Sequence, residues 1–172
     1  DGPPGTRVAV TVFTTDNVYG LDPDRLRWDG ARLVADGLSW AGQQRRSEGR
    51  VEVEVEQVDG GVHLCVTAEH AEPIKSVKVL FRGLPEAALG AGWWQMTSPE
   101  GASMRVRPGG QLLWRYPWPE GDAWPEWETP FAVAGDAICV SVRDPEVRPV
   151  RLFVHRPPWA DGEHVVEVVC ED

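Results

Sequence analysis

The stretch Pro108–Pro130 holds the residue types in this chain that are best suited to ligand chemistry. Indole rings can stack on the C–H faces of a sugar, and carboxylates can accept hydrogen bonds from its hydroxyls. Prolines between the aromatic residues exclude a helix and interrupt sheet pairing, so the stretch is predicted to be a long excursion between strands. The candidate ligand-binding residues are Trp114, Tyr116, Trp118, Trp124, Trp127, Glu126 and Glu128.

The same aromatic residues have a second interpretation. They could plug one end of a β-sandwich or dock against a neighbouring domain, because buried aromatic rings are more common than ligand platforms. Glu126 and Glu128 would share one face of an extended segment, and glycoside hydrolysis needs two carboxylates on opposite sides of the scissile bond. No feature of the sequence shows that either carboxylate is desolvated. We therefore assign no catalytic residue, and we leave open whether the chain has activity of its own.

Other catalytic and cofactor motifs are missing from the sequence. The four histidines (His63, His70, His155 and His164) show no metal-ligand spacing, which predicts no metal site. The sequence contains no G-x-S-x-G nucleophile motif and no glycine-rich phosphate loop. We expect no cofactor.

The amino-acid composition disfavours some classes of binding partner. The formal net charge is -10, which disfavours binding to nucleic acid and to an anionic membrane surface. No apolar run is long enough to span a bilayer. The 172 residues fit a single domain, residues 1–172, and the opening DGPPGTR without Met suggests a processed chain or a fragment of a longer one. The cellular location stays open between cytoplasmic and exported, for a soluble protein.

Three cysteines, Cys65, Cys139 and Cys170, lie in apolar alternating stretches without metal-type spacing. Their odd number argues against a disulfide framework, so we expect free, unreactive thiols on strands.

Alternation of apolar and polar residues predicts strands throughout the chain. Arg50–Val58 is the clearest, with valines directed to a core and Glu52, Glu54 and Glu56 to solvent. The Asp29-Gly30 and Asp59-Gly60 pairs predict tight hairpin turns. Val62–Glu69 and Ile74–Arg82 would continue Arg50–Val58 as a three-stranded meander, with glutamates facing lysines and arginine across the strands. The expected core residues are Val51, Val53, Val55, Leu64, Val66, Val77, Val79, Phe81, Ile138, Val140, Leu152 and Val166, with Val58 as a further candidate.

Many short strands separated by turn residues indicate an all-β protein. We predict an antiparallel β-sandwich of roughly 11–13 strands with negligible helix and two large sheets.

The order of these elements resembles a known family. The meander VEVEVEQVDGGVHLCVTAEH, followed by IKSVKVLFRGLP, and the later Tyr116-Pro117 motif with the Arg143-Asp144-Pro145 turn resemble the N-terminal supersandwich domains of bacterial glycoside hydrolases, whose fold is shared with galactose mutarotases. The resemblance implies a supersandwich-like domain that packs against a catalytic barrel. The Glu base and His acids of mutarotases have no convincing counterparts here.

Three functions follow from these features. The first is a non-catalytic β-sandwich domain of a carbohydrate-active protein, an accessory domain of a glycoside hydrolase, in which the tryptophan-rich stretch docks a domain or contacts sugar. The second is a free-standing carbohydrate-binding module, and the third is a small epimerase-like or hydrolytic enzyme. The expected partner is a carbohydrate or an adjacent catalytic domain.

Overall fold

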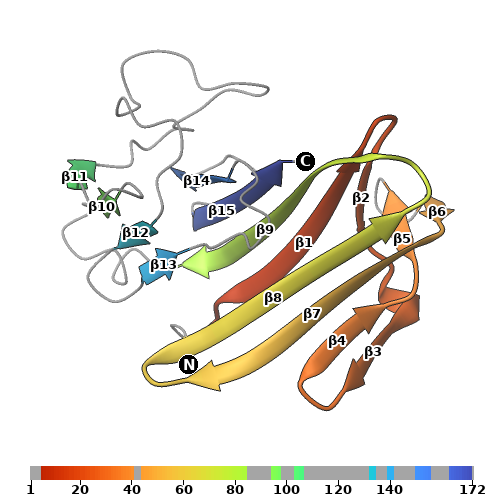
Figure 1. The fold of residues 1–172 in the computed structure, drawn as a ribbon, viewed down its shortest axis with the longest axis horizontal. Helices are drawn as coiled ribbons and strands as arrows, with labels where there is room; N and C mark the ends of the chain where they lie inside the picture. The colour runs from red at the N-terminus through yellow and green to blue at the C-terminus, as the bar shows by residue number, and fades with distance from the viewer. Residues whose placement is uncertain are drawn as a thin grey trace. The chain divides into compact units, whose positions relative to one another are not determined.

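A computed structural model describes residues 5–40, 44–84, 94–97, 103–106, 132–134, 139–141, 150–155 and 163–171. These residues form fifteen strands and one short 3₁₀ helix, η1 (Figure 1). The elements are β1 (Arg7–Thr14), β2 (Val18–Leu21), η1 (Pro23–Arg25), β3 (Leu26–Asp29), β4 (Arg32–Ala35), β5 (Leu38–Trp40), β6 (Arg45–Ser47), β7 (Gly49–Val58), β8 (Gly61–His70), β9 (Ile74–Leu84), β10 (Trp94–Thr97), β11 (Ser103–Val106), β12 (Ala132–Ala134), β13 (Cys139–Ser141), β14 (Val150–His155) and β15 (His164–Glu171).

The strands form three sheets rather than the two that were expected. One has seven strands in the order β14-β15-β9-β1-β2-β5-β6, and the other two have four strands each, β11-β10-β12-β13 and β3-β4-β7-β8. Each strand pair with a described register is antiparallel. The all-β, antiparallel, sandwich-like fold class is thus confirmed.

The strand count exceeds the predicted 11–13 because short strands escaped the alternation pattern. β2 lies in a segment that was expected to be turns, and β6 lies in a segment that is polar throughout. β2 pairs with β1 and β5 inside the seven-stranded sheet, and β6 pairs with β5 at its edge. Backbone pairing to a neighbour forms these strands, and a three-residue polar strand leaves no period-2 signal.

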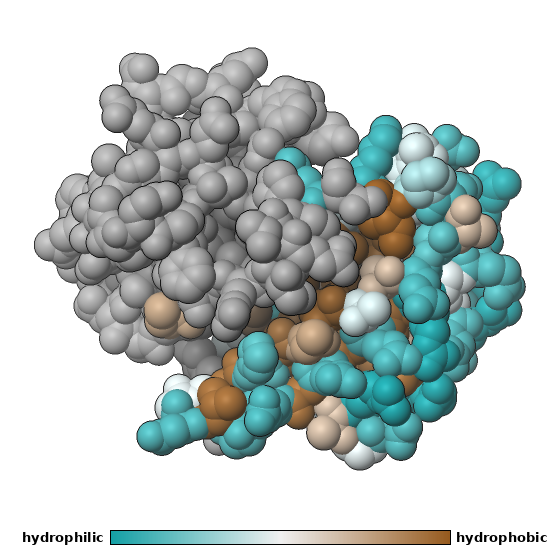
Figure 2. All heavy atoms as spheres, viewed as in Figure 1, coloured by the Kyte–Doolittle hydropathy of each residue, from teal (hydrophilic) through white to brown (hydrophobic). Residues whose placement is uncertain are grey.

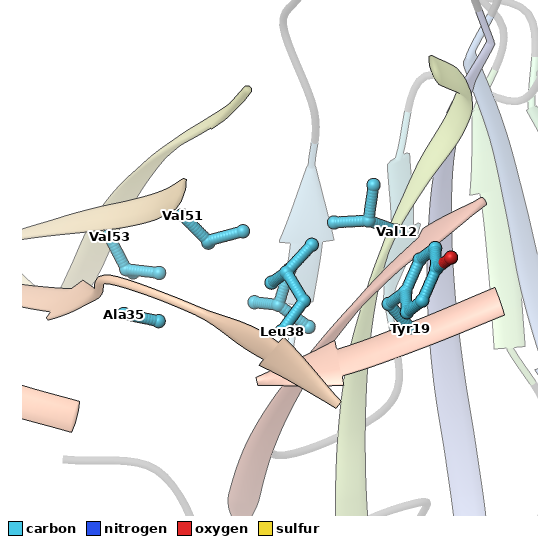
Figure 3. Packing of buried hydrophobic residues seen from close by; sticks show 7 residues of the cluster. Val12, Tyr19, Ala35, Leu38, Val51 and Val53 are labelled. Carbon is cyan, nitrogen blue, oxygen red and sulfur yellow. The ribbon is translucent and has the colours of Figure 1, made fainter. Parts of the chain in front are cut away.

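The chain divides into two compact units, one made chiefly of residues 10–78 and one of residues 2–9 and 79–171. The first unit has its own sandwich core. Val12 of β1, Tyr19 of β2 and Leu38 of β5 pack with residues of β4 and β7 from the four-stranded sheet β3-β4-β7-β8 (Figure 3). The complete cluster is Val10, Val12, Tyr19, Ala35, Leu38, Val51 and Val53. Burial of these side chains is the main source of stability for the unit. The single domain over residues 1–172 stays a prediction.

Two predicted hairpin turns are confirmed. Asp29 and Arg32 close the turn between β3 and β4, and Gly30 has φ +63°. Val58 and Gly61 close the turn between β7 and β8, and Gly60 has φ +81°. Positive φ is the conformation that a two-residue turn demands and that glycine adopts without strain.

The three-stranded meander is wrong in its last step. β7 and β8 form a hairpin, but β9 belongs to the seven-stranded sheet, between β15 and β1. The chain passes from one sheet to the other at Ala71–Pro73, where the N–H of Thr15 donates a hydrogen bond to the carbonyl of Pro73. The glutamates of β7 therefore do not face the lysines of β9 across a strand pair. Proline at the turn is compatible with either outcome, so sequence pattern did not separate them.

The expected core is confirmed for Val51, Val53, Val140 and Val166, which are buried. Val55, Leu64, Val66 and Val77 pack against the core cluster while partly exposed. Val79 and Phe81 are also partly exposed, and Val58 is 41% exposed because it lies on the outer face at the hairpin turn. Ile138 lies outside the described residues. Leu152 belongs to β14, but the structure does not describe the burial of its side chain.

The second unit holds β10–β13 and pairs β14 with β15. β15 departs from alternation, since Val165, Val166, Val168 and Val169 are all buried and so is Glu167. A strand covered on both faces reads as a continuous apolar run rather than as an alternating one.

Candidate functional site

The predicted ligand-binding residues fall in a part of the chain that the structure does not describe. Trp114, Tyr116, Trp118, Trp124, Trp127, Glu126 and Glu128 all lie within residues 107–131, outside the described ranges. Their assignment to a sugar or to a docking surface stays a prediction.

A serine–histidine pair in the first unit has the residue types of a nucleophile and its base. Ser47 Oγ of β6 lies 2.8 Å from His70 Nε2, at the end of β8. The imidazole stacks on Tyr19, with ring centroids 5.1 Å apart. The backbone N–H of Glu72 donates to His70 Nδ1 at 3.0 Å, and Thr14 Oγ1 donates to the Glu72 carboxylate at 2.7 Å. Ser47 of β6, Tyr19 of β2 and the backbone N–H of Glu72 thus all contact the imidazole of His70.

The hydrogen bonds fix the imidazole in the tautomer that a general base cannot use. A backbone N–H is always a donor, so Nδ1 of His70 must accept and carries no proton in the neutral ring. The proton then sits on Nε2, which donates to Ser47 Oγ. In a nucleophile–base pair the roles are reversed: Nε2 accepts the hydroxyl proton, and a third group accepts from Nδ1–H. The pair is therefore a structural tie between β6 and the end of β8.

Sequence reading treated His70 as an isolated strand-end histidine and did not pair it with Ser47. The two residues are separated by 23 positions and belong to different sheets. No local motif contains both, so only the packing of the two sheets brings them together.

A layer of ion pairs covers the outer face of the sheet β3-β4-β7-β8. Arg50 donates to Glu52 from Nε at 2.7 Å and also pairs with Asp36, while Arg32 Nη1 lies 3.1 Å from the second oxygen of Glu52. Arg27 Nε binds the other oxygen of Asp36 at 3.1 Å. The hydrogen bonds from Arg50 lower the pKa of Glu52 below its usual value, and those to Glu52 raise the pKa of Arg50.

An apolar residue lies among these charges on the outer face of the sheet. Val34 lies on the outer face, with Arg27 and Glu52 as its Cα partners, yet it is fully buried and is no member of the core cluster. The aliphatic stems of long arginine side chains can cover such a residue while their charged ends stay in water. The carboxylates of Asp36 and Glu52 are already paired with arginines.

Two tryptophans in the described part of the chain are exposed, Trp40 at 37% and Trp28 to a greater extent. Trp28 on the edge strand β3 is 60% exposed. Its Cα partner is Leu33, which packs on the core cluster, so Trp28 lies on the inner face of the sheet. It was not among the predicted ligand-binding residues.

The described thiols are free, as predicted. Cys65 and Cys139 are exposed and Cys170 is partly exposed. That the thiols are unreactive stays a prediction, and burial would not explain it at Cys65 and Cys139, because both residues are exposed.

No group of three or more His, Cys, Asp or Glu side chains in the described ranges could hold a metal ion. No helix in the same ranges is both long and apolar enough to cross a membrane.

Comparisons with known proteins identify no protein that is similar to this chain. Neither the protein-family models nor the curated proteins nor the solved structures give a match to this chain.

Proposed function

We propose that this chain is a non-catalytic β-sandwich domain of a carbohydrate-active protein, with the tryptophan-rich stretch as its contact region. The observation that supports a scaffold role is the Ser47–His70 geometry. It is the nucleophile-type contact of the described residues, and its imidazole donates to the serine instead of accepting from it. The arginine-paired carboxylates of the outer face agree with that role, because each is already engaged in structural ion pairs.

The carbohydrate part of the proposal rests on the sequence. Residues 108–130 combine five aromatic side chains with four carboxylates, and stiff proline segments present rings at a low entropic cost. A sugar on one such ring would bind with about 4 to about 8 kcal/mol, which is millimolar to micromolar affinity. A catalytic partner domain would instead bury several rings at once.

The test is tryptophan fluorescence of the whole chain during titration with neutral oligosaccharides. Trp124→Ala and Trp127→Ala are the test variants, and Trp28→Ala is the matched control because its indole is exposed but lies in the first unit. We expect a sugar-dependent change that both test variants lose and the control keeps. If no oligosaccharide changes the wild-type spectrum, the sugar contact is refuted. Turnover of aryl glycosides by the isolated chain would refute the non-catalytic role.

A further inference from the structure

Among the described strands, β8 forms an unusually long sheet edge without a paired neighbour on its outer side. It is the outermost strand of the sheet β3-β4-β7-β8 and has ten residues, whereas β3 at the opposite edge has four. Its register with β7 runs without a bulge from Gly49 opposite His70 to Val58 opposite Gly61. Natural proteins usually shield such edges with Pro, Lys, bulges or short strands, and β8 contains none of these. A bare edge of this length is a template for another strand.

The hydrogen-bonding groups on that edge can be identified from the turn. A two-residue turn is closed by a hydrogen-bonded pair, here Val58 and Gly61, and bonded pairs then alternate along the hairpin. His63, Cys65 and Thr67 accordingly bond to β7. The N–H and C=O groups that point away from β7 belong to Val62, Leu64, Val66 and Ala68, and among the described residues nothing binds them.

The side chains of those four residues lie on the inner, apolar face of the sheet. Their Cα partners on β7 include the core residues Val51 and Val53. Val62 is 45% exposed, and Leu64, Val66 and Ala68 are partly exposed although they pack on the core cluster. Hydrophobic surface is visible in Figure 2 over the region where Figure 1 draws the β7–β8 hairpin. A second strand alongside β8 would therefore cover apolar surface as well as satisfy the backbone.

We propose that β8 pairs antiparallel with the β8 of a second copy of this chain, about a two-fold axis that passes between the two Cys65 residues. The pairing would join two four-stranded sheets into one continuous sheet. It goes beyond the proposed function and does not depend on it.

The sequence of β8 is complementary to itself in this register. On the inner face Val62 meets Ala68 of the second copy, and Leu64 meets Val66, so apolar residues face apolar residues. On the outer face His63 meets Thr67, and no like charges lie opposite each other. Moving the axis to Val66 would instead place Val62 opposite His70, whose ring is held by Ser47 and Glu72. An axis at Cys65 thus gives apolar pairs at these inner-face positions and leaves the contacts of His70 undisturbed.

The thiol of Cys65 allows the proposed register between the two β8 strands to be tested by disulfide formation. It is exposed and free, and on the axis it forms a non-hydrogen-bonded pair with its own copy. Cα atoms of such a pair are about 4.5 Å apart, a separation that a disulfide can span. Diamide would convert the two thiols to one disulfide by accepting their two protons and two electrons. Cys139→Ser and Cys170→Ser together remove the other thiols from the experiment.

The principal experiment is sedimentation velocity of the full chain at about 1 to about 200 µM, since an edge contact of this size gives a weak, concentration-dependent dimer. Cys65→Lys places two ammonium groups face to face across the axis and should weaken dimerisation by about ten-fold or more. In the monomer the same substitution faces Glu54, its Cα partner on β7, which favours folding. Thr67→Lys is the control, because it adds the same charge to the same face but faces His63 of the second copy.

We expect wild type, Cys65→Ser and Thr67→Lys to dimerise and Cys65→Lys to remain monomeric with an unchanged circular dichroism spectrum. Cys65→Arg serves as a second disrupting variant if Cys65→Lys folds poorly. Mass spectrometry after diamide treatment should find the peptide of Cys65 linked to itself. A chain that is monomeric at all concentrations overturns the proposal, as does a dimer that Cys65→Lys and Cys65→Arg leave intact or that diamide fails to link through Cys65.

Discussion

Arg46 Nε lies 3.1 Å from Oδ2 of Asp22, a carboxylate that is completely buried. Asp22 also accepts from the N–H of Asp24 at 3.1 Å and so caps η1, the turn through which the chain passes from β2 to β3. β2 and β3 belong to different sheets. The ion pair and the cap therefore hold the crossing between the two layers of the first unit.

Replacing Asp22 by Ala should lower the free energy of unfolding by about 2 kcal/mol, because the N-cap hydrogen bond and the ion pair with Arg46 are lost together. Urea denaturation measures the change. Asp24→Ala is the matched control: its carboxylate also pairs with Arg46 but is 66% exposed, and exposed pairs contribute about 0–1 kcal/mol. Equal losses for the two variants would mean that burial of Asp22 is unimportant.

Val53 tests the register of the core. Val53→Asp should lower the free energy of unfolding by about 3–5 kcal/mol, since it creates a cavity and buries an unpaired charge in the core cluster. Val62→Asp is the comparison, on the same face of the sheet but 45% exposed, and should have a much smaller effect. Thermal denaturation separates the outcomes. An unchanged melting temperature for Val53→Asp would contradict the assigned register.

Ser47 should not act as a nucleophile. An aryl fluorophosphonate probe, which labels activated serines, is expected to leave Ser47 unmodified because His70 Nε2 donates to its hydroxyl. Mass spectrometry of the treated chain reads out the modification, with a serine protease as the positive control. Labelling that His70→Ala abolishes would show that the imidazole accepts the proton, contrary to the hydrogen bond from Glu72.

The Arg50–Glu52 contact gives stability a pH dependence at the acidic end. Hydrogen bonding from Arg50 lowers the folded-state pKa of Glu52 below its ordinary 4.5, so the unfolded chain binds the proton more readily than the folded one. The contribution of Glu52 is present above pH 4.5 and disappears as the pH falls through the folded-state pKa. Glu52→Gln should therefore show a smaller fall in melting temperature than wild type between about pH 7 and about pH 3, a range that includes the ordinary pKa of glutamate.

Glu54→Gln is the control for that titration. Glu54 is exposed on the same strand, two residues further along, and makes no ion pair among the described residues. Its variant should retain the wild-type acid sensitivity. If Glu52→Gln and Glu54→Gln behave alike, the contact with Arg50 has no part in the pH dependence.

Local pattern was enough to predict the all-β class, the two glycine turns and much of the first core. Arg50–Val58 alternates strictly, so Val51 and Val53 had to share a face once the segment was extended. The Asp-Gly turns follow from the φ that only glycine adopts readily. These features depend on residues that are neighbours in the chain, and the sequence alone contains that information.

Tertiary structure decided which strands share a sheet and which distant side chains meet. β9 follows β8 in the chain but pairs in the seven-stranded sheet, whereas β8 belongs to the sheet β3-β4-β7-β8. Ser47 meets His70 only because these two sheets pack together. The tautomer of His70 depends on one backbone N–H, that of Glu72, at a turn between sheets. Pairing partners and hydrogen-bond directions of this kind are set by the lowest free energy of the whole fold, and no local period in the sequence encodes them.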